Sequence, residues 1–193
     1  MRLHGSVSAD LPLLVVALED EAEHLHVSGL PILVTEPGKV NAAVAVARTL
    51  ALQPPAEVIN LGTAGALVEG MEGIHVIGTV LEHDLDDSAW FRYRGEHYSA
   101  PLVLGAGPIL ATGDVFIDDP VVRDRLAESA QLVDMEGYAV AKAAREAGVP
   151  VRLVKQVSDQ AGAGARRTWS EQVAACAEEL GLWVRNERAF ARF

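Results

Sequence analysis

Short apolar runs recur along the chain, and segments with helical character separate them. Six runs have the length and composition of buried strands, at positions 13–17, 30–35, 57–61, 74–81, 108–113 and 151–157. Four other segments are typical of helices, at positions 40–50, 118–128, 137–148 and 168–182. Strands that alternate with helices predict an α/β fold with a mixed, largely parallel central β-sheet flanked by helices.

The length and charge of the chain narrow the classes of protein to which it can belong. Its 193 residues, half of them apolar, are typical of one domain with a sizeable core, so we expect residues 1–193 to form a single domain. Its 27 acidic residues outnumber 16 basic ones, for a formal net charge of −11. Because binding to a phosphate backbone depends on Lys and Arg, we expect neither a nucleic-acid partner nor an anionic membrane partner.

Cysteine and histidine usage points to a cytoplasmic protein without a metal site. Cys176 is the only cysteine, so the chain cannot form an internal disulfide and does not fit an oxidising compartment. No signal-like apolar run precedes Asp10, and no later run has the length of a membrane span. His24 and His26 are two residues apart, which places them on different faces of a helix, so we expect no metal ligation.

Two acidic residues stand where α/β sheets usually bind ligands. Glu136 comes at the start of an expected helix, and Asp159 directly follows the expected strand 151–157. Each also has an ordinary interpretation, because Glu136 could answer the helix dipole and Asp159 could cap a turn. A buried strand delivers its terminal acid into a cleft, so the pair predicts a site built from two carboxylates.

Two further segments follow strand ends. The acidic run 19–21 comes after the first strand, and we expect at most one of its three acids to face a cleft while the others lie in a solvated helical turn. Residues 62–65, Gly-Thr-Ala-Gly, are expected to form a strand-to-loop turn whose backbone a ligand can approach closely. The Gly38-Lys39 segment does not match a phosphate loop. Neither residues 62–65 nor residues 105–107 match a dinucleotide-binding fingerprint.

Three local features complete the expected layout. Residues 90–93 are interpreted as a short strand or a lid, and residues 162–165 as a mobile loop. The last helix is expected to begin near Thr168, with Glu171 at the capping-box position.

Six motifs, taken in chain order, resemble the purine nucleoside phosphorylase superfamily, and the similarity is greatest to its 5′-methylthioadenosine/S-adenosylhomocysteine nucleosidases. Any one motif is weak, but six in the right order across about 150 residues are specific. The motifs are Ala17-Leu-Glu-Asp-Glu21, Gly38-Lys-Val-Asn-Ala-Ala43, Asn60-Leu-Gly-Thr-Ala-Gly65, Ala111-Thr-Gly-Asp-Val-Phe-Ile117, Val133-Asp-Met-Glu136 and Val157-Ser-Asp159. The resemblance implies a nucleoside phosphorylase-like fold.

The resemblance also implies roles for three acids. Glu21 matches the acid that holds the attacking water, and Glu136 the acid that binds the ribose 2′- and 3′-hydroxyls. Asp159 matches the acid that protonates purine N7, with Ser158 beside it as support. These residue types suit the reaction, since breaking an N-glycosidic bond places positive charge on the ribose and negative charge on the base.

The substrate-binding residues are implied in the same way. They comprise a stacking aromatic, a backbone group at the purine edge, a methionine against the nucleoside, the loop after the third strand and an aromatic at the 5′ pocket. In that order they are Phe116, Ile117, Met135, the segment Thr63, Ala64 and Gly65, and Trp169.

Hydrolysis of a purine nucleoside, with adenine as the expected base, is therefore the predicted reaction, with no cofactor and a homodimeric assembly as in the family. Asn60 stands where phosphorylases usually place a phosphate-binding arginine, and the acidic run 19–21 would repel phosphate. The alternatives are a phosphate-dependent phosphorylase and a catalytically silent nucleoside-binding protein. Two departures, a shortened segment 66–112 and Lys155 in place of an arginine, leave the 5′ group and the choice between adenine and a 6-oxopurine open.

Overall fold

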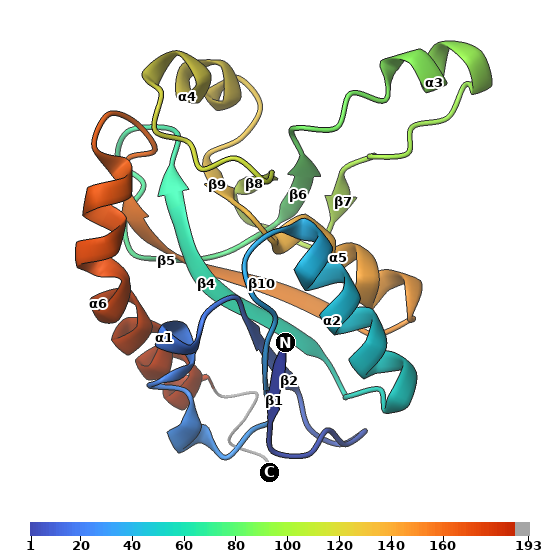
Figure 1. The fold of residues 1–193 in the computed structure, drawn as a ribbon, viewed down its shortest axis with the longest axis vertical. Helices are drawn as coiled ribbons and strands as arrows, with labels where there is room; N and C mark the ends of the chain where they lie inside the picture. Colours follow the sequence, from blue (N-terminus) through green and yellow to red (C-terminus); the bar gives the residue numbers. More distant parts are fainter. Residues whose placement is uncertain (188–193) are drawn as a thin grey trace.

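The computed structural model describes residues 1–187, which form one ten-stranded sheet with helices on both faces (Figure 1). The strands are β1 (Arg2–His4), β2 (Leu13–Val16), β3 (Ile32–Val34), β4 (Val58–Ala66), β5 (Ile74–Val76), β6 (Thr79–Glu82), β7 (Leu102–Val103), β8 (Ile109–Thr112), β9 (Leu132–Asp134) and β10 (Val151–Asp159). The helices are α1 (Glu19–Ala22), a 3₁₀ turn (His26–Ser28), α2 (Lys39–Leu52), α3 (Ser88–Arg94), α4 (Pro120–Ala127), α5 (Gly137–Glu146) and α6 (Ala165–Asn186). The predicted fold class is confirmed.

The long strands at the centre of the sheet pair in parallel. Strand β4 lies between β2 and β10 and pairs in parallel with both, while its far end turns to pair antiparallel with β9. Parallel strands buried on both faces read as continuous apolar runs, which is the pattern of residues 13–16, and in residues 58–61 only the buried Asn60 interrupts it. The mixture of parallel and antiparallel pairs matches the mixed sheet expected from the sequence.

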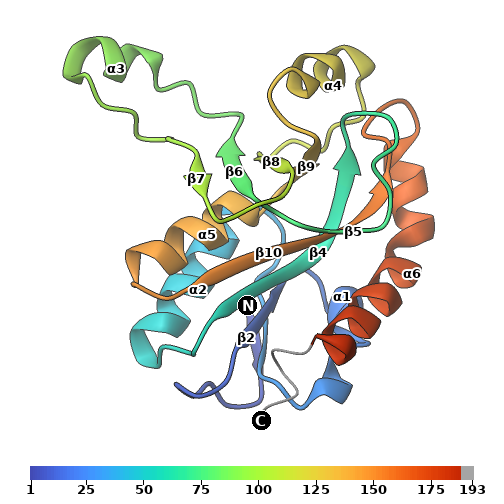
Figure 2. The same ribbon diagram turned by 180° about the vertical axis from the view of Figure 1, so that it is seen from behind.

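Helices cover the two faces of the sheet in pairs. Helices α2 and α5 pack on one face through residues such as Val46 and Val140, and α1 and α6 pack on the other through Ala22 and Leu180. Figures 1 and 2 show α6 on the opposite side of the sheet from α2 and α5. Among residues 1–187, no helix is both long enough and apolar enough to cross a membrane.

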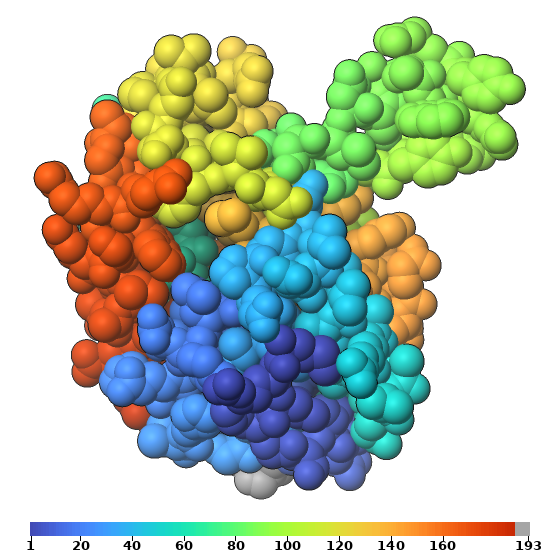
Figure 3. All heavy atoms as spheres, viewed as in Figure 1, coloured from blue at the N-terminus to red at the C-terminus, as the bar shows by residue number. Residues whose placement is uncertain are grey.

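Residues 83–101 form an arm that projects from the body beyond β6 and β7 (Figures 1 and 3). The arm contains α3, so residues 90–93 are helical, and the expectation of a strand there is wrong. The helix ends at Gly95, whose φ of 73° reverses the chain. The buried carboxylate of Asp87 then accepts the backbone N–H groups of Tyr98 (2.7 Å) and Ser99 (3.2 Å), which holds the returning chain beside the helix.

Three other local expectations are corrected. Residues 62–65 are not a turn but the second half of β4, because β10 pairs with them as far as Gly65. The run 74–81 divides into β5 and β6, which pair with different strands. Helix α6 begins at Ala165 rather than near Thr168, because Gly164 adopts a φ of 89° and lets the backbone start the helix earlier.

Candidate active site

All eleven residues predicted for the site line one cavity at the carboxyl edge of the sheet. They come from the ends of β9 and β10, the second half of β4, the segments after β2 and β8, and the first turns of α6. Figure 3 shows this hollow between the yellow segment before α4, the orange start of α6 and the blue segment after β2. The structure thus brings the predicted residues together, while their individual roles stay predictions.

The carboxylate of Glu21 is held by three backbone N–H groups. One oxygen, Oε2, accepts from Ala17 (3.0 Å) and Leu18 (3.1 Å), and Oε1 accepts from Thr63 (3.2 Å). Glu21 is buried, whereas the neighbouring acids Glu19 and Asp20 are exposed, as the sequence predicted for this run. Burial raises the pKa of Glu21, and the nearby Lys155 ammonium opposes that rise.

Glu136 is the N-cap residue of α5, and its side chain faces the cavity. Its Oε1 accepts the backbone N–H of Gly38 at 2.8 Å, which ties the start of α5 to the segment before α2. Burial, with the charge of Asp134 as a second cause, raises the pKa of Glu136 from its ordinary 4.5 to about 7. A carboxyl group with this pKa changes its charge near neutral pH.

A buried ion pair beneath these acids has no counterpart in the sequence-based predictions. Lys155 on β10 is 1% exposed, and its Nζ lies 2.9 Å from Asp134 Oδ2. Asp134 also accepts the hydroxyl of Thr112 (2.6 Å) and the N–H of Gly137 (2.8 Å). Burial lowers the pKa of Lys155, but Asp134, Glu136 and Glu21 outweigh it, so the net change is upward and the amine stays charged.

Asp159 lies at the end of β10, where an irregularity in the pairing with β4 falls between Val157 and Asp159. Its Oδ2 accepts the hydroxyl of Ser158 at 2.8 Å, and its Oδ1 accepts the N–H of Ala161 at 2.8 Å. Burial raises the pKa of the Asp159 carboxyl. That direction favours the protonated form, which a proton donor to a base requires.

Two aromatic rings form the outer wall of the cavity. The rings of Phe116 and Trp169 lie 6.4 Å apart at 72°, an edge-to-face arrangement, and Trp169 Nε1 donates to the Thr63 hydroxyl at 2.9 Å. The guanidinium of Arg166 lies 5.3 Å from the centre of the Phe116 ring on the outer side. Ile117 and Met135 also line the cavity, so a flat ligand would meet apolar side chains here.

The sequence contained one signal for the missed pair. Asp134 precedes Gly137 by three residues, and a Cβ at Gly137 would lie 2.9 Å from Asp134 Oδ2, so this glycine leaves room for the buried carboxylate. Similarly, a Cβ at Gly62 would lie 3.2 Å from Glu21 Oε1 and 3.4 Å from Lys155 Nζ. The missing side chains at both positions therefore make space for charged groups.

The charges around the cavity are mainly negative. Four carboxyl groups line it, and Lys155 is the only Lys or Arg among its described lining residues. Since that lysine already pairs with Asp134, an anionic ligand would gain little attraction here. Within residues 1–187, no group of three or more His, Cys, Asp or Glu side chains is arranged to hold a metal ion.

The burial of Glu136 leads to a stability prediction. A carboxyl group whose pKa is raised by folding contributes stability that is fully present below about pH 4.5 and is lost as the pH rises through about 7. Glu136→Gln, which keeps an acceptor for Gly38, should therefore raise the free energy of unfolding at pH 8 by on the order of 2 kcal/mol. Urea denaturation at pH 8 and pH 4.5 measures this, and a gain of equal size at both values would contradict it.

The mixed α/β sheet with a carboxylate-lined cavity at its carboxyl edge agrees with the nucleoside phosphorylase-like fold expected from the sequence. The family model of the phosphorylase superfamily matches residues 101–182. A 5′-methylthioadenosine/S-adenosylhomocysteine nucleosidase from Marinomonas sp. (strain MWYL1) is 28% identical over 174 residues, covering 76% of this chain and 75% of that protein. The chain is therefore similar to the phosphorylase superfamily over residues 101–182 and to this nucleosidase over most of its length.

Two solved structures show how closely the fold is shared. The 5′-methylthioadenosine/S-adenosylhomocysteine nucleosidase from Helicobacter pylori, with butyl-thio-DADMe-Immucillin-A, matches with a TM-score of 0.82 at 17% identity, covering 96% of this chain and 99% of that one. Futalosine hydrolase from Helicobacter pylori strain 26695 matches with a TM-score of 0.83 at 17% identity, covering 92% and 96%. At this identity the likeness establishes the fold alone.

Proposed function

We propose that the protein hydrolyses the N-glycosidic bond of a purine nucleoside, with 5′-methylthioadenosine or S-adenosylhomocysteine as the first candidates, and releases the free base and the ribosyl product. The observation that carries the proposal is the placement of three carboxyl groups in one cavity with different surroundings. Asp159 lies among neutral groups, Glu136 at a helix start, and Glu21 in a nest of backbone N–H groups. The relatives named as nucleosidases of these two compounds support the choice of candidates.

The chemistry assigns one step to each acid. Asp159, whose pKa is raised by burial in the direction that favours the protonated form, donates its proton to N7 of the purine as the bond from C1′ to N9 breaks. Glu136 accepts hydrogen bonds from the ribose hydroxyls as a carboxylate, which stabilises positive charge developing on the sugar. Glu21 orients a water molecule for attack on C1′ and takes up its proton. The purine itself would pack against Phe116.

Water is favoured over phosphate as the nucleophile by the charges of the cavity. A phosphate dianion would need cationic partners, and the lining offers only Lys155, already bound to Asp134. The nearby carboxylate of Glu21 would repel it, on the order of 4 kcal/mol for two unit charges 4 Å apart at an effective dielectric of about 20. A phosphorylase is therefore the weaker alternative.

The proposal is tested by incubating purified protein with a panel of purine nucleosides in phosphate-free buffer and separating the products by chromatography. The panel should include 5′-methylthioadenosine, S-adenosylhomocysteine, adenosine and inosine. We expect free adenine from at least one of the first two, and the preferred substrate identifies the 5′ group. Absence of base release from every nucleoside would contradict the proposal and favour the silent nucleoside-binding alternative.

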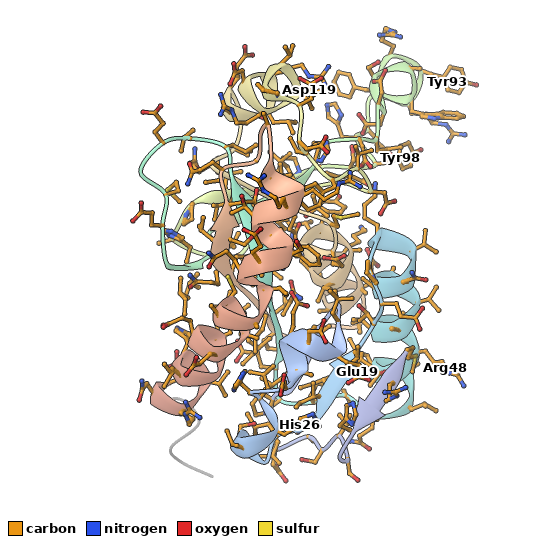
Figure 4. All side chains as sticks on the ribbon, turned by 60° about the vertical axis from the view of Figure 1, so that its left-hand side comes forward. Glu19, His26, Arg48, Tyr93, Tyr98 and Asp119 are labelled. Carbon is orange, nitrogen blue, oxygen red and sulfur yellow. The ribbon has the colours of Figure 1, made fainter. Side chains whose placement is uncertain are left out.

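We further propose that residues 1–193 form one functional domain and that the chain acts as a cytoplasmic homodimer. Helix α2 presents Val40, Val44 and Leu52 to solvent, with 72%, 60% and 80% of each residue exposed. The arm 83–101, which carries the exposed Trp90 and Tyr93, lies on the same side of the molecule (Figures 1 and 4). Exposed apolar surface of this extent is typical of interaction sites, and a second copy would cover it. The cytoplasmic location rests on the single cysteine.

The dimer has its own test. Sedimentation velocity of the wild-type protein at micromolar concentration should show a dimer, and Val44→Glu should shift it toward monomer because a charge would be buried in the interface. Val27→Glu, also at an exposed position but on the 3₁₀ turn, serves as the matched control. A wild-type monomer at all concentrations would contradict the proposal.

A further inference from the structure

Asn60 is a buried polar residue in the wall of the cavity, and one of its two side-chain groups lacks a partner. It lies on β4, is 2% exposed and lines the cavity with Glu21 and Lys155. Its Nδ2 donates to the Val15 carbonyl at 3.1 Å. Its Oδ1 is buried and has no hydrogen-bond partner among the described residues. An unpaired buried acceptor costs about 1–3 kcal/mol, so a bound group that satisfies it would be expected.

The Val15 carbonyl determines which way the amide of Asn60 points. A carbonyl oxygen accepts only from the amide nitrogen, so rotation by 180° would bring two acceptors together. Oδ1 is therefore the group left free, rather than the NH₂ group. The ligand that Asn60 can serve is a hydrogen-bond donor.

Asn60 and Glu21 line the same part of the cavity. Asn60 and Gly62 are two residues apart on β4 and share a face of the sheet. The position that a Cβ of Gly62 would take is 3.2 Å from Glu21 Oε1. The Val15 carbonyl on β2 accepts from the Asn60 amide, and the N–H of Ala17, the residue after β2, donates to Glu21 Oε2. Backbone groups at the end of β2 and just after it therefore bind both side chains.

We propose that Asn60 Oδ1 is the second acceptor for the attacking water, and thus a catalytic residue; this inference rests on the proposed hydrolytic function. The water donates one hydrogen to Glu21 and the other to Asn60, which leaves a lone pair free for C1′. As the bond from oxygen to C1′ forms, the bond from C1′ to N9 breaks and N7 takes the proton of Asp159. The water proton that faces Glu21 passes to the Glu21 carboxylate. The other water hydrogen, which faces Asn60, stays on the oxygen as the hydroxyl of the product. Two acceptors orient the water where one would leave it free to rotate.

Two substitutions separate this role from a structural one. Asn60→Leu removes both the donor to Val15 and the free acceptor, whereas Asn60→Asp loses the donor but keeps an acceptor at the same place. We expect kcat of Asn60→Leu to fall by about 10–100-fold with KM within about threefold of wild type, since the water is held apart from the nucleoside. Asn60→Asp should retain a kcat at least about tenfold above Asn60→Leu.

A purely structural role of Asn60 predicts a different relation between the kcat values of the two variants. If Asn60 served only to join β4 to β2, both variants would lose the bond to Val15, and their kcat values would fall together with their melting temperatures. Thr49→Val is the matched control, because Thr49 is buried and hydrogen-bonded to Ala45 on α2, away from the cavity lining. It should lower stability without changing kcat.

The outcomes distinguish this inference from the function on which it rests. Base release by wild type with normal kcat in folded Asn60→Leu would overturn the role of Asn60 alone, as would equal losses in Asn60→Leu and Asn60→Asp. Absence of base release by wild type would overturn the proposed function and, with it, the inference.

Discussion

Asp159→Asn is expected to lower kcat by about 10²–10⁴-fold, the usual contribution of one positioned proton transfer. The variant should remain folded, because an asparagine oxygen can still accept the Ala161 N–H and its amide can donate to the Ser158 hydroxyl. What it lacks is the proton for purine N7, so the base would have to leave as an anion. Steady-state base release from the best nucleoside substrate measures the loss.

A substrate with a better leaving group separates proton donation from other roles of Asp159. A 4-nitrophenyl riboside releases an anion that is stable without protonation, so its hydrolysis should fall far less in the variant than that of the purine nucleoside. Asp124→Asn is the matched control, because Asp124 is exposed and pairs only with Arg123 on α4. Equal losses on both substrates would remove Asp159 from the proton-transfer step.

Glu21→Gln is expected to reduce kcat by a similar factor, about 10²–10⁴-fold, through loss of the base that receives the proton of water. One end of the glutamine can still accept from Ala17 and Leu18, but an NH₂ group facing the Thr63 N–H would lose the third hydrogen bond. A modest fall in melting temperature is therefore expected besides the loss of turnover. Binding of free adenine should change little, because Glu21 is assigned to water rather than to the base.

For Glu21→Gln, in contrast to Asp159→Asn, we expect the same loss of activity with either leaving group. Activation of water is needed whatever group departs, so the 4-nitrophenyl riboside should lose activity as strongly as the purine nucleoside. Glu19→Gln provides the control on the same helix, since Glu19 is exposed and pairs with Arg2. Full activity of folded Glu21→Gln on both substrates would exclude Glu21 from the mechanism.

Local signals in the sequence predicted most of the fold and the position of the acids. The local composition of β2 and β10 indicated two strands, with Glu21 shortly after the first and Asp159 at the end of the second, so both acids could be placed without knowledge of the strand pairing. The prediction of a turn at residues 62–65 was wrong because these residues pair with β10, which is about 90 residues away along the chain. Glycine there reads locally as a turn, and only the partner strand makes it extended.

The missed features depend on contacts that a single sequence does not reveal. Lys155 and Asp134 lie on the consecutive strands β10 and β9, which do not pair with each other in the sheet, and Gly137 leaves room for the Asp134 carboxylate. The aromatic residues of α3 favour strands by propensity, but the turn at Gly95 and the side chain of Asp87 stabilise a helical arm. The unpaired oxygen of Asn60 likewise appears only when the Val15 carbonyl is in place.

The identity of the nucleophile tests the central claim most directly. The initial rate of base release from the best substrate should be measured across phosphate concentrations from none to about 50 mM, well above the typical KM range of about 1 μM to 1 mM. The sugar product should be identified in each reaction by ³¹P NMR and chromatography. For hydrolysis, we expect an unchanged rate of base release and a free ribosyl sugar at every phosphate concentration. A rate that requires phosphate, with a ribose 1-phosphate product, would contradict it.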